Sequence, residues 1–206
     1  MKSSSNTLRT SLDRAFYARE TALVARQLLG NLLVSTVAGK RVEGRIVETE
    51  AYLGPHDPAS HAAERIGRTQ RNASMFGPPG IAYIYRIYGV HWCLNVVTMQ
   101  EDFPAAVLIR AIEPLRGLDT MRQRRWPAGH AGPDHSIASG PGKLAAALGI
   151  TGELDGHDLR KSPLFLMPDS VIAEDEIVCG PRIGITRALD WPLRFRVSGN
   201  PWVSRA

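Results

Sequence analysis

The sequence has few cysteines and few lysines and no long run of apolar residues, and each shortage excludes a class of protein. Its two cysteines, Cys93 and Cys179, lie far apart and form no C-x-x-C pair, which excludes a zinc knuckle and a dithiol redox motif. We expect two reduced, buried thiols in a cytoplasmic protein. Without a long apolar run or an apolar stretch behind the N-terminus, we expect neither membrane insertion nor secretion.

The positive charge of the chain comes almost entirely from arginine. Lysine and arginine exceed aspartate and glutamate by 25 to 20, and only four of the 25 are lysines. Arginine favours planar, bidentate contacts to phosphate, so this bias favours a nucleic-acid partner. A high-GC codon bias would give the same composition, so both explanations stay open.

Local patterns predict one α+β domain around a mostly antiparallel sheet. We expect disorder in residues 1–12 and a single domain over residues 13–206. Helical spacing covers residues 13–29, which Gly30 ends, and also 118–125 and 143–148. Residues 126–139 have no periodicity. Strand patterns cover residues 32–37, 41–53, 82–88, 91–98, 105–111, 164–167, 182–186 and 193–197.

The stretch at residues 45–53 predicts a strand that runs into a loop at Gly54-Pro55. Alternation along a strand places Ile46, Glu48, Glu50 and Tyr52 on one side. A carboxylate at the mouth of a strand can act as a general base on water if the site excludes bulk solvent. The alternative is the solvated polar face of an edge strand.

A tyrosine-rich hairpin is predicted at residues 81–95. Tyr83 and Tyr85 share a strand face, whereas Tyr88 has the opposite parity and lies beside the turn at Gly89. A ring on the sheet can stack on an extruded base, and a ring at the tip can wedge into a duplex. The alternative is that these tyrosines line a core, because tyrosine has a high strand propensity.

Two further stretches carry positive charge on glycine-containing segments. Gly140-Pro-Gly-Lys143 is not an ATP-binding P-loop, because Leu144 and Ile137 stand where a hydroxyl residue and a glycine are needed. It can hold a DNA phosphate or simply start a helix. Arg65, Arg68 and Arg71 can likewise grip a phosphate backbone or form a solvated loop. No H-E-x-x-H motif occurs, and we expect no metal and no cofactor.

Seven segments, taken together and in this order, resemble the alkyladenine (3-methyladenine) DNA glycosylase family. They are residues 44–55 (GRIVETEAYLGP), 57–61 (DPASH), 75–80 (MFGPPG), 83–89 (YIYRIYG), 108–114 (LIRAIEP), 140–144 (GPGKL) and 199–204 (GNPWVS). The resemblance implies a curved, partly open barrel-like sheet flanked by helices, with a protruding β-hairpin.

The resemblance also implies roles for individual residues. Glu50 matches the general base that activates the attacking water, and Arg110 and the main-chain carbonyl of Ile183 match groups that position this water. The residues that sandwich, orient or select the flipped base match Tyr52, His61, Tyr85 and Asn95. Tyr88 matches the residue that intercalates into the duplex.

The implied activity is excision of alkylated or deaminated purines from double-stranded DNA by a monomer, in the cytoplasm or on the nucleoid if the source is bacterial. A carboxylate suits this reaction, because cleavage of an N-glycosidic bond builds positive charge on the sugar. No matched position offers a lysine nucleophile, so we expect a monofunctional enzyme. His91-Trp92 departs from the aromatic pair common in the animal members, and the lesion range stays open.

Two other readings remain at this point. The chain can be a non-enzymatic nucleic-acid-binding module, in which the arginines and tyrosines matter and Glu50 does not. It can also be a nucleoside or sugar hydrolase that uses Glu48 and Glu50 as a carboxylate pair.

Overall fold

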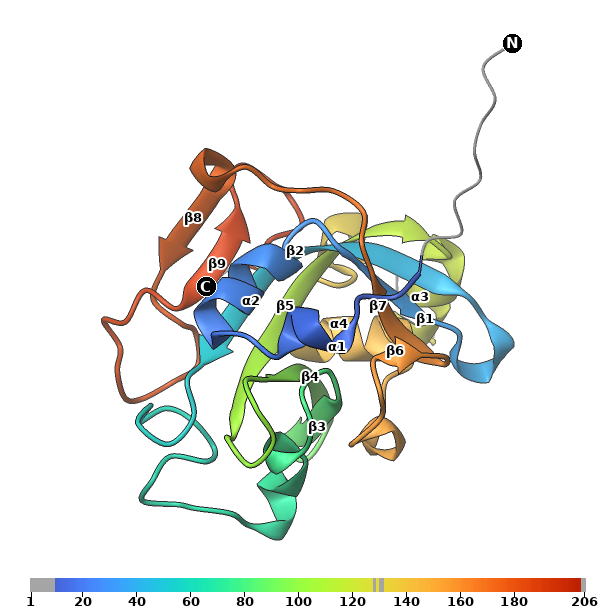
Figure 1. Cartoon of the computed structure of the whole chain (residues 1–206). Coiled ribbons are helices and arrows are strands. Elements are labelled where there is room, and N and C mark those ends of the chain that lie inside the picture. Colours follow the sequence, from blue (N-terminus) through green and yellow to red (C-terminus); the bar gives the residue numbers. More distant parts are fainter. Residues whose placement is uncertain (1–9, 128, 130–131, 205–206) are drawn as a thin grey trace.

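A computed structural model describes residues 10–127, 129 and 132–204 (Figure 1). Its helices are α1 (Arg14–Tyr17), α2 (Thr21–Leu28), α3 (Leu118–Arg125) and α4 (Pro141–Leu148). Its strands are β1 (Leu32–Ser35), β2 (Val42–Tyr52), β3 (Ala82–Ile87), β4 (His91–Thr98), β5 (Ala105–Arg116), β6 (Arg160–Lys161), β7 (Leu164–Met167), β8 (Ile177–Gly180) and β9 (Arg194–Val197).

These strands form one antiparallel sheet in the described part of the chain, and the sheet curls into a half-barrel (Figure 1). Seven strands follow the order β3-β4-β5-β2-β1-β7-β6, and β9 pairs with both β2 and β8. The long strand β2 joins these parts, because its first half pairs with β1 and its second half pairs with β9. The predicted α+β fold with an antiparallel, barrel-like sheet is confirmed.

The main core lies on one face of this sheet. The core side chains Leu94, Val96, Val107 and Ile109 alternate with side chains that point to the opposite face. Helix α2 packs on β2 and β5, and α4 packs on β4 and β5. Ala25 in α2 also accepts a hydrogen bond from the Thr49 hydroxyl at 2.8 Å. The other face is therefore free to build a site.

The predicted helix at residues 13–29 is two helices. Asp13 caps α1 through its contact with the amide of Phe16. Glu20 then caps α2, because its carboxylate accepts hydrogen bonds from the amides of Ala22 and Leu23. Two N-terminal caps within eight positions divide the segment, since each one satisfies the free amides of a new first turn. Gly30 follows α2 at a positive φ of 86°, as predicted.

The predicted strand at residues 182–186 is wrong, and a strand forms at β8 instead. Gly184 has a positive φ of 77°, and the amide of Ile183 donates to a side chain on β2. Neither feature is compatible with a regular ladder. The expected alternation from Ile46 to Tyr52 is also interrupted, because the register shifts on either side of Glu48.

Three smaller expectations have different outcomes. Cys93 is buried as expected, whereas Cys179 is exposed on β8 and that expectation is wrong. Helix α4 begins at Pro141, two residues early, because proline suits the first helical position. The disorder expected for residues 1–12 falls mainly outside the described residues, and the amide of Leu12 donates to the carbonyl of Leu166.

None of the helices described is long and apolar enough to cross a membrane.

Candidate active site

The register of the sheet places one residue from each of four neighbouring strands in a single row. Glu50 on β2 pairs with Leu108 on β5, which also pairs with Asn95 on β4. Asn95 in turn pairs with Tyr83 on β3. Paired residues point to the same face of a sheet, so the row gathers a carboxylate, an amide and a phenol on the face away from the main core.

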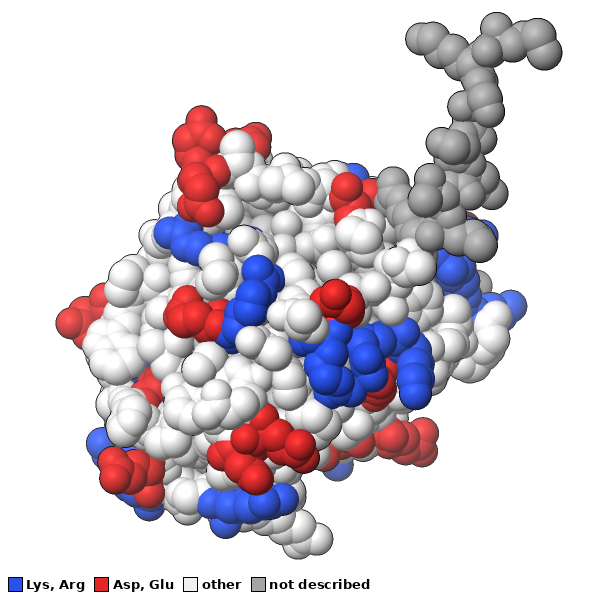
Figure 2. Space-filling view, viewed as in Figure 1, with Lys and Arg blue, Asp and Glu red and all other residues white. Residues whose placement is uncertain are grey.

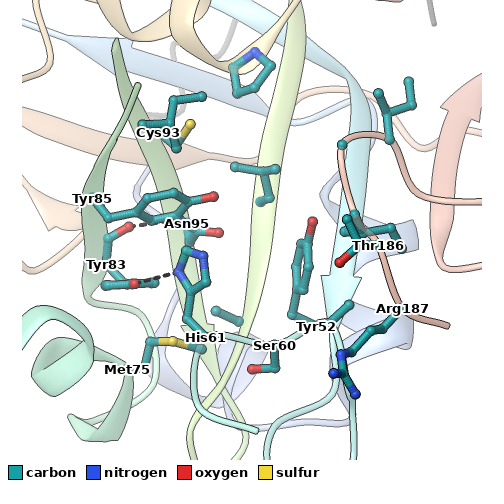
Figure 3. Close-up of a pocket in the computed structure, with 18 of the residues that line it drawn as sticks. Tyr52, Ser60, His61, Met75, Tyr83, Tyr85, Cys93, Asn95, Thr186 and Arg187 are labelled. Atoms are coloured by element: carbon teal, nitrogen blue, oxygen red, sulfur yellow. Dashed lines mark hydrogen bonds between the residues drawn. The ribbon is translucent and has the colours of Figure 1, made fainter. Parts of the chain in front are cut away.

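A cavity of about 410 Å³ lies over this face, bordered by the loops at residues 58–66 and 183–187 and open to solvent. The Tyr52 ring stands on one side of it, and His61 and Tyr85 stand on the other (Figure 3). The volume is within the range typical of sites for small organic groups. Two aromatic walls that face each other across a gap are suited to hold a flat, aromatic ligand.

Glu50 lies directly behind the wall of this cavity, fully buried. Its Oε1 accepts a hydrogen bond from the amide of Ile183 at 2.7 Å and lies 3.3 Å from Nη1 of Arg110. Its Oε2 accepts a hydrogen bond from the Tyr52 hydroxyl at 2.9 Å. All three partners line the cavity. The carboxylate is thus held at the cavity by the residues that form its surface.

Burial raises the pKa of Glu50, and this rise is opposed by Arg110, the amide of Ile183 and the Tyr52 hydroxyl. A carboxylate with a raised pKa is a stronger base once it is ionised, and a base works best when its pKa approaches the working pH. The environment therefore suits Glu50 to accept a proton.

Arg110 lies between two carboxylates. Its Nε donates to Oε1 of Glu48 at 3.3 Å, while its Nη1 faces Glu50. Glu48 also accepts from Nε of Arg194 at 2.6 Å and from the amide and hydroxyl of Ser204 at 2.7 and 2.9 Å. Glu48 is thus fully occupied in holding Arg110 and the segment after β9 in place.

The wall opposite Tyr52 is an aromatic cluster of three residues. His61 meets the Tyr85 ring edge-on with centroids 4.4 Å apart, and its Nδ1 lies 2.9 Å from the hydroxyl of Tyr83 (Figure 3). Burial and the charge of Arg71 lower the pKa of His61, so the ring is neutral near pH 7. The contact between Nδ1 of His61 and the Tyr83 hydroxyl is a hydrogen bond in either tautomer of the ring, and it fixes the orientation of the imidazole.

Asn95 lies on the floor of the cavity and is almost fully buried. Its Nδ2 donates to the main-chain carbonyl of Tyr83 at 3.0 Å, which fixes the orientation of the amide. Cys93 lies two residues before Asn95 on the same face of β4, and burial raises the pKa of its thiol to about 11. The thiol is therefore protonated and unreactive at neutral pH.

Tyr88 is at the tip of the β3-β4 hairpin. Its side chain is 88% exposed, and it borders the mouth of the cavity. Tyr88 and Gly89 both have positive φ angles, 49° and 70°, as a tight hairpin turn requires. A bulky residue in this conformation is uncommon and costs about 1–3 kcal/mol. The turn thus presents a large aromatic ring to solvent beside the cavity.

The residues predicted to contact phosphate lie around the cavity or near it. Arg65 lines the mouth. Arg71 donates to the carbonyl of Arg86 at 3.1 Å, and Arg68 lies 3.7 Å from Asp102. Lys143 is exposed in the first turn of α4, and the preceding Pro141 borders the cavity.

Three residues of the site were not predicted from the sequence as site residues. Tyr83 was recognised as a strand tyrosine, but its bond to His61 depends on a partner 22 positions away. Arg187 lines the mouth of the cavity opposite Tyr85 (Figure 3). Arg182 lies fully buried behind Tyr52. No local pattern marks the two arginines, because their setting is created by the loop that follows β8.

Among the residues that the structure describes, no cluster of three or more His, Cys, Asp or Glu side chains could hold a metal ion. The site is therefore built from a buried carboxylate, a guanidinium and aromatic rings.

Comparison with known proteins agrees with this geometry. Residues 15–201 match the family model described as methylpurine-DNA glycosylase. A relative from Methanoculleus marisnigri is 50% identical over 200 residues, which are 95% of this chain and 99% of its own. Another, from Anaeromyxobacter dehalogenans strain 2CP-1, is 49% identical over 198 residues, which are 94% of this chain and 85% of its own. The names of both describe them as candidate 3-methyladenine DNA glycosylases.

The aromatic cavity, the buried glutamate behind it and the match over most of the chain lead to one conclusion: the chain belongs to the methylpurine-DNA glycosylase family, whose members are hydrolases that act on N-glycosyl bonds.

Proposed function

We propose that this protein excises damaged purines from double-stranded DNA by hydrolysing the bond between base and deoxyribose, with Glu50 as the base that activates water. The observation that carries the proposal is the position of the Glu50 carboxylate, bonded to Tyr52, Ile183 and Arg110 at the wall of an aromatic cavity. A duplex hides the glycosidic bond inside the base stack, so the damaged nucleotide has to leave the stack to reach this cavity.

The reaction needs one proton acceptor. The oxygen of a water attacks C1′ of the sugar as the C1′–N bond breaks, and the water proton passes to Glu50. The sugar gains positive charge in the transition state, which the nearby carboxylate stabilises. Arg110 and the main chain at Ile183 contact Glu50 and line the cavity, so they are placed to orient this water.

The leaving base takes the electron pair of the broken bond. A purine alkylated at N3 or N7 already carries positive charge and departs as a neutral molecule, so the reaction needs no acid. Tyr52 on one side and His61 and Tyr85 on the other sandwich the base, and Asn95 contacts its edge. No lysine is among the described residues that line the cavity. Water is therefore the nucleophile, and the product is an intact strand with an abasic site.

Tyr88 fills the gap that the everted nucleotide leaves in the duplex. Its ring is exposed at a hairpin tip beside the cavity, as a wedge requires. Arg65, Arg68, Arg71 and Lys143 are all exposed, and they hold the phosphates on either side. One chain supplies every part of the site, so the enzyme acts as a monomer, in the cytoplasm or on the nucleoid in a bacterial cell.

The substitution Glu50→Gln tests the proposal. It keeps the shape of the side chain but removes the proton acceptor. Release of purines from methylated duplexes should fall by at least about a hundredfold, the usual scale of a general base, while binding to DNA with an abasic site persists. The assay is release of free base in a buffer with a chelator.

Glu113→Gln is the matched control, because Glu113 lies on β5 and pairs with Arg45 outside the cavity. It should release base at the wild-type rate. Release by Glu50→Gln as fast as by the wild type would show that the assigned base is wrong. A wild-type protein that binds DNA but frees no purine would instead be a non-enzymatic binding module.

A further inference from the structure

One arginine outside the cavity holds several parts of its wall. The guanidinium of Arg182 is fully buried and forms two hydrogen bonds with the carboxylate of Asp57, which is fully buried as well. Its Nη1 also donates to the main-chain carbonyl of Ala51 at 3.0 Å. Ala51 is the residue between Glu50 and Tyr52. The guanidinium is therefore anchored to the backbone that carries both of these side chains.

The second partner, Asp57, shapes the loop that leads to His61. Its Oδ2 accepts from the amide of Leu53 at 3.1 Å, and its Oδ1 accepts from the amide of Ala59 at 3.0 Å. These bonds fold residues 53–59 into a tight turn against Arg182. The same ion pair thus joins the end of β2 to the loop that supplies the opposite aromatic wall.

The position of Arg182 in the chain adds a third connection. The next residue, Ile183, donates its amide to Oε1 of Glu50 at 2.7 Å. That amide can stay on Glu50 only while the segment after β8 stays against β2. Arg182 is the buried side chain that fastens this segment there.

Arg182 also supports the Tyr52 ring directly. The carbon of its guanidinium lies 4.7 Å from the ring centroid. Tyr52 lines the cavity and Arg182 does not, so the guanidinium covers the face of the ring that is turned away from the cavity. A cation stacked on a ring holds the ring against rotation and displacement.

We propose that Arg182 is a positioning residue for base release, which holds the Tyr52 ring and the Ile183 amide against Glu50 through its bonds to Asp57 and Ala51. The inference rests on the proposed function. According to this inference, a residue outside the cavity maintains the geometry around the catalytic carboxylate.

The energetics of buried ion pairs agree with a role in geometry. Removing two charges from water offsets most of their attraction, so such a pair contributes little net stability compared with apolar residues of the same shape. Nε of Arg182 has no hydrogen-bond partner among the described residues. The stacking on Tyr52 and the bidentate hydrogen bonds to Asp57 therefore set the orientation of the guanidinium, and Nε is left without a hydrogen bond as a result.

Loss of these contacts should be visible in the pH profile. The charged and titratable groups around Glu50 are Arg110 on β5, Glu48 and Tyr52 on β2 and Cys93 on β4. The Ile183 amide and the Tyr52 hydroxyl both lower the pKa of Glu50 against the larger effect of burial. If Arg182 no longer holds them, the pKa rises further, so more Glu50 is protonated at a given pH and the acid limb of the rate profile moves to higher pH.

Two variants and one control test the inference. Arg182→Lys keeps a charge opposite Asp57 but loses the planar stack and the second bond, and the double change Asp57→Asn with Arg182→Met removes both charges. Arg45→Lys is the control. Like Arg182, Arg45 pairs with carboxylates, but its partners Glu113 and Asp169 lie away from the cavity. Single-turnover base release is measured from pH 5 to 9, together with the dissociation constant for DNA that holds an abasic site.

Both Arg182 variants should release base about ten- to hundredfold more slowly near pH 7, the scale of a small misplacement of a reacting group. Their acid limbs should lie at higher pH, while their dissociation constants stay within about threefold of the wild type. Arg45→Lys should change none of these quantities.

If both Arg182 variants had the same acid limbs and the same rates of base release as Arg45→Lys, the inference would be wrong, while the proposed function would stand. Loss of folded circular dichroism in both Arg182 variants would also overturn it, since the pair would then serve the fold and not the geometry. If the wild-type protein releases no base, the proposed function is wrong, and this result is distinct from the two that overturn only the role of Arg182.

Discussion

Two glutamates on one strand face have different environments, although only Thr49 separates them. Glu48 is contacted by Arg110, Arg194 and Ser204, and of these only Arg110 is among the described residues that line the cavity. The partners described for Glu50, which are Tyr52, Ile183 and Arg110, all line it. A glycosidase that uses a pair of carboxylates needs both to reach the substrate. This difference supports our proposal that Glu50, and not Glu48, is the base, with Glu48 holding Arg110 in place.

The hydroxyl of Tyr83 offers a test at the level of one atom. Its hydrogen bond with Nδ1 of His61 sets the orientation of a ring that lines the cavity. Tyr83→Phe removes about 1 kcal/mol of net hydrogen bonding, so base release or lesion binding should weaken about fivefold, measured by single-turnover excision and by titration with lesion DNA.

Tyr17→Phe is the matched control for this change. The Tyr17 hydroxyl is buried in the main core without a hydrogen-bond partner among the described residues. Its removal should leave excision unchanged and should not lower the melting temperature, because a buried hydroxyl without a partner destabilises the fold. Equal losses in both variants would show that the Tyr83 effect is general and not due to His61.

Strand parity alone predicted part of the site. It predicted one shared face for Ile46, Glu48, Glu50 and Tyr52, but Ile46 packs in the main core because the register shifts at Glu48. Tyr83 and Tyr85, predicted to share a face of their strand, line the cavity together with Tyr52. Parity could not predict Arg182 or Ser204, whose partners are 125 and 156 positions away. Their roles come from the way the loops return to β2, which no local pattern encodes.

At the scale of elements, the sequence predicted the regular strands well and the interruptions poorly. Strand β2 lies within one residue of its predicted bounds at each end, whereas β5 begins as predicted at Ala105 but continues past the predicted end at residue 111 to Arg116. The break between α1 and α2 depends on the capping carboxylate of Glu20, a residue that also suits the interior of a helix. The segment at 182–186 has the composition of a strand, but its backbone is used by the site.

The β3-β4 hairpin presents an exposed aromatic ring at its tip, and substitution of this ring tests the proposed wedge. Tyr88→Ser removes the exposed ring and should leave the melting temperature unchanged, because the ring is 88% exposed. Capture of lesions in duplex DNA should weaken by about tenfold or more, while excision from single strands changes little, since a single strand has no gap to fill.

Val171→Ser controls for the loss of an exposed apolar side chain. Val171 is 97% exposed and does not line the cavity. It should behave as the wild type on both substrates. Equal losses for Tyr88→Ser on duplex and on single strands would contradict a wedge at the hairpin tip.

At the scale of the whole molecule, the net charge of +5 is modest for a chain of 206 residues. On the face shown in Figure 2, basic and acidic side chains are interspersed. We therefore expect binding to DNA to depend on individual exposed basic residues and not on a strong overall field.

This arrangement predicts a moderate dependence on salt. If Arg65, Arg68, Arg71 and Lys143 each contact one phosphate, the logarithm of the affinity should fall with the logarithm of salt with a slope near −4. Arg65→Gln should reduce the slope by about one, and Lys161→Gln on β6, which does not line the cavity, should leave it unchanged. Titration of fluorescent duplex DNA at several salt concentrations gives the slopes. Activity on free nucleosides that ignores salt would indicate a different kind of hydrolase.

The long separations between Glu48, Glu50 and their partners have a consequence for how the protein is made. Glu50 is bound by Ile183, and Glu48 by Arg194 and Ser204, which are 133, 146 and 156 positions later in the chain. A ribosome adding roughly 5–20 residues per second needs about 7–30 seconds to reach them. Of the partners of these two carboxylates, Tyr52 and Arg110 are made early, whereas Ile183, Arg194 and Ser204 are made late. We therefore expect the contacts of both glutamates to be complete only after β9 and Ser204 have been synthesised.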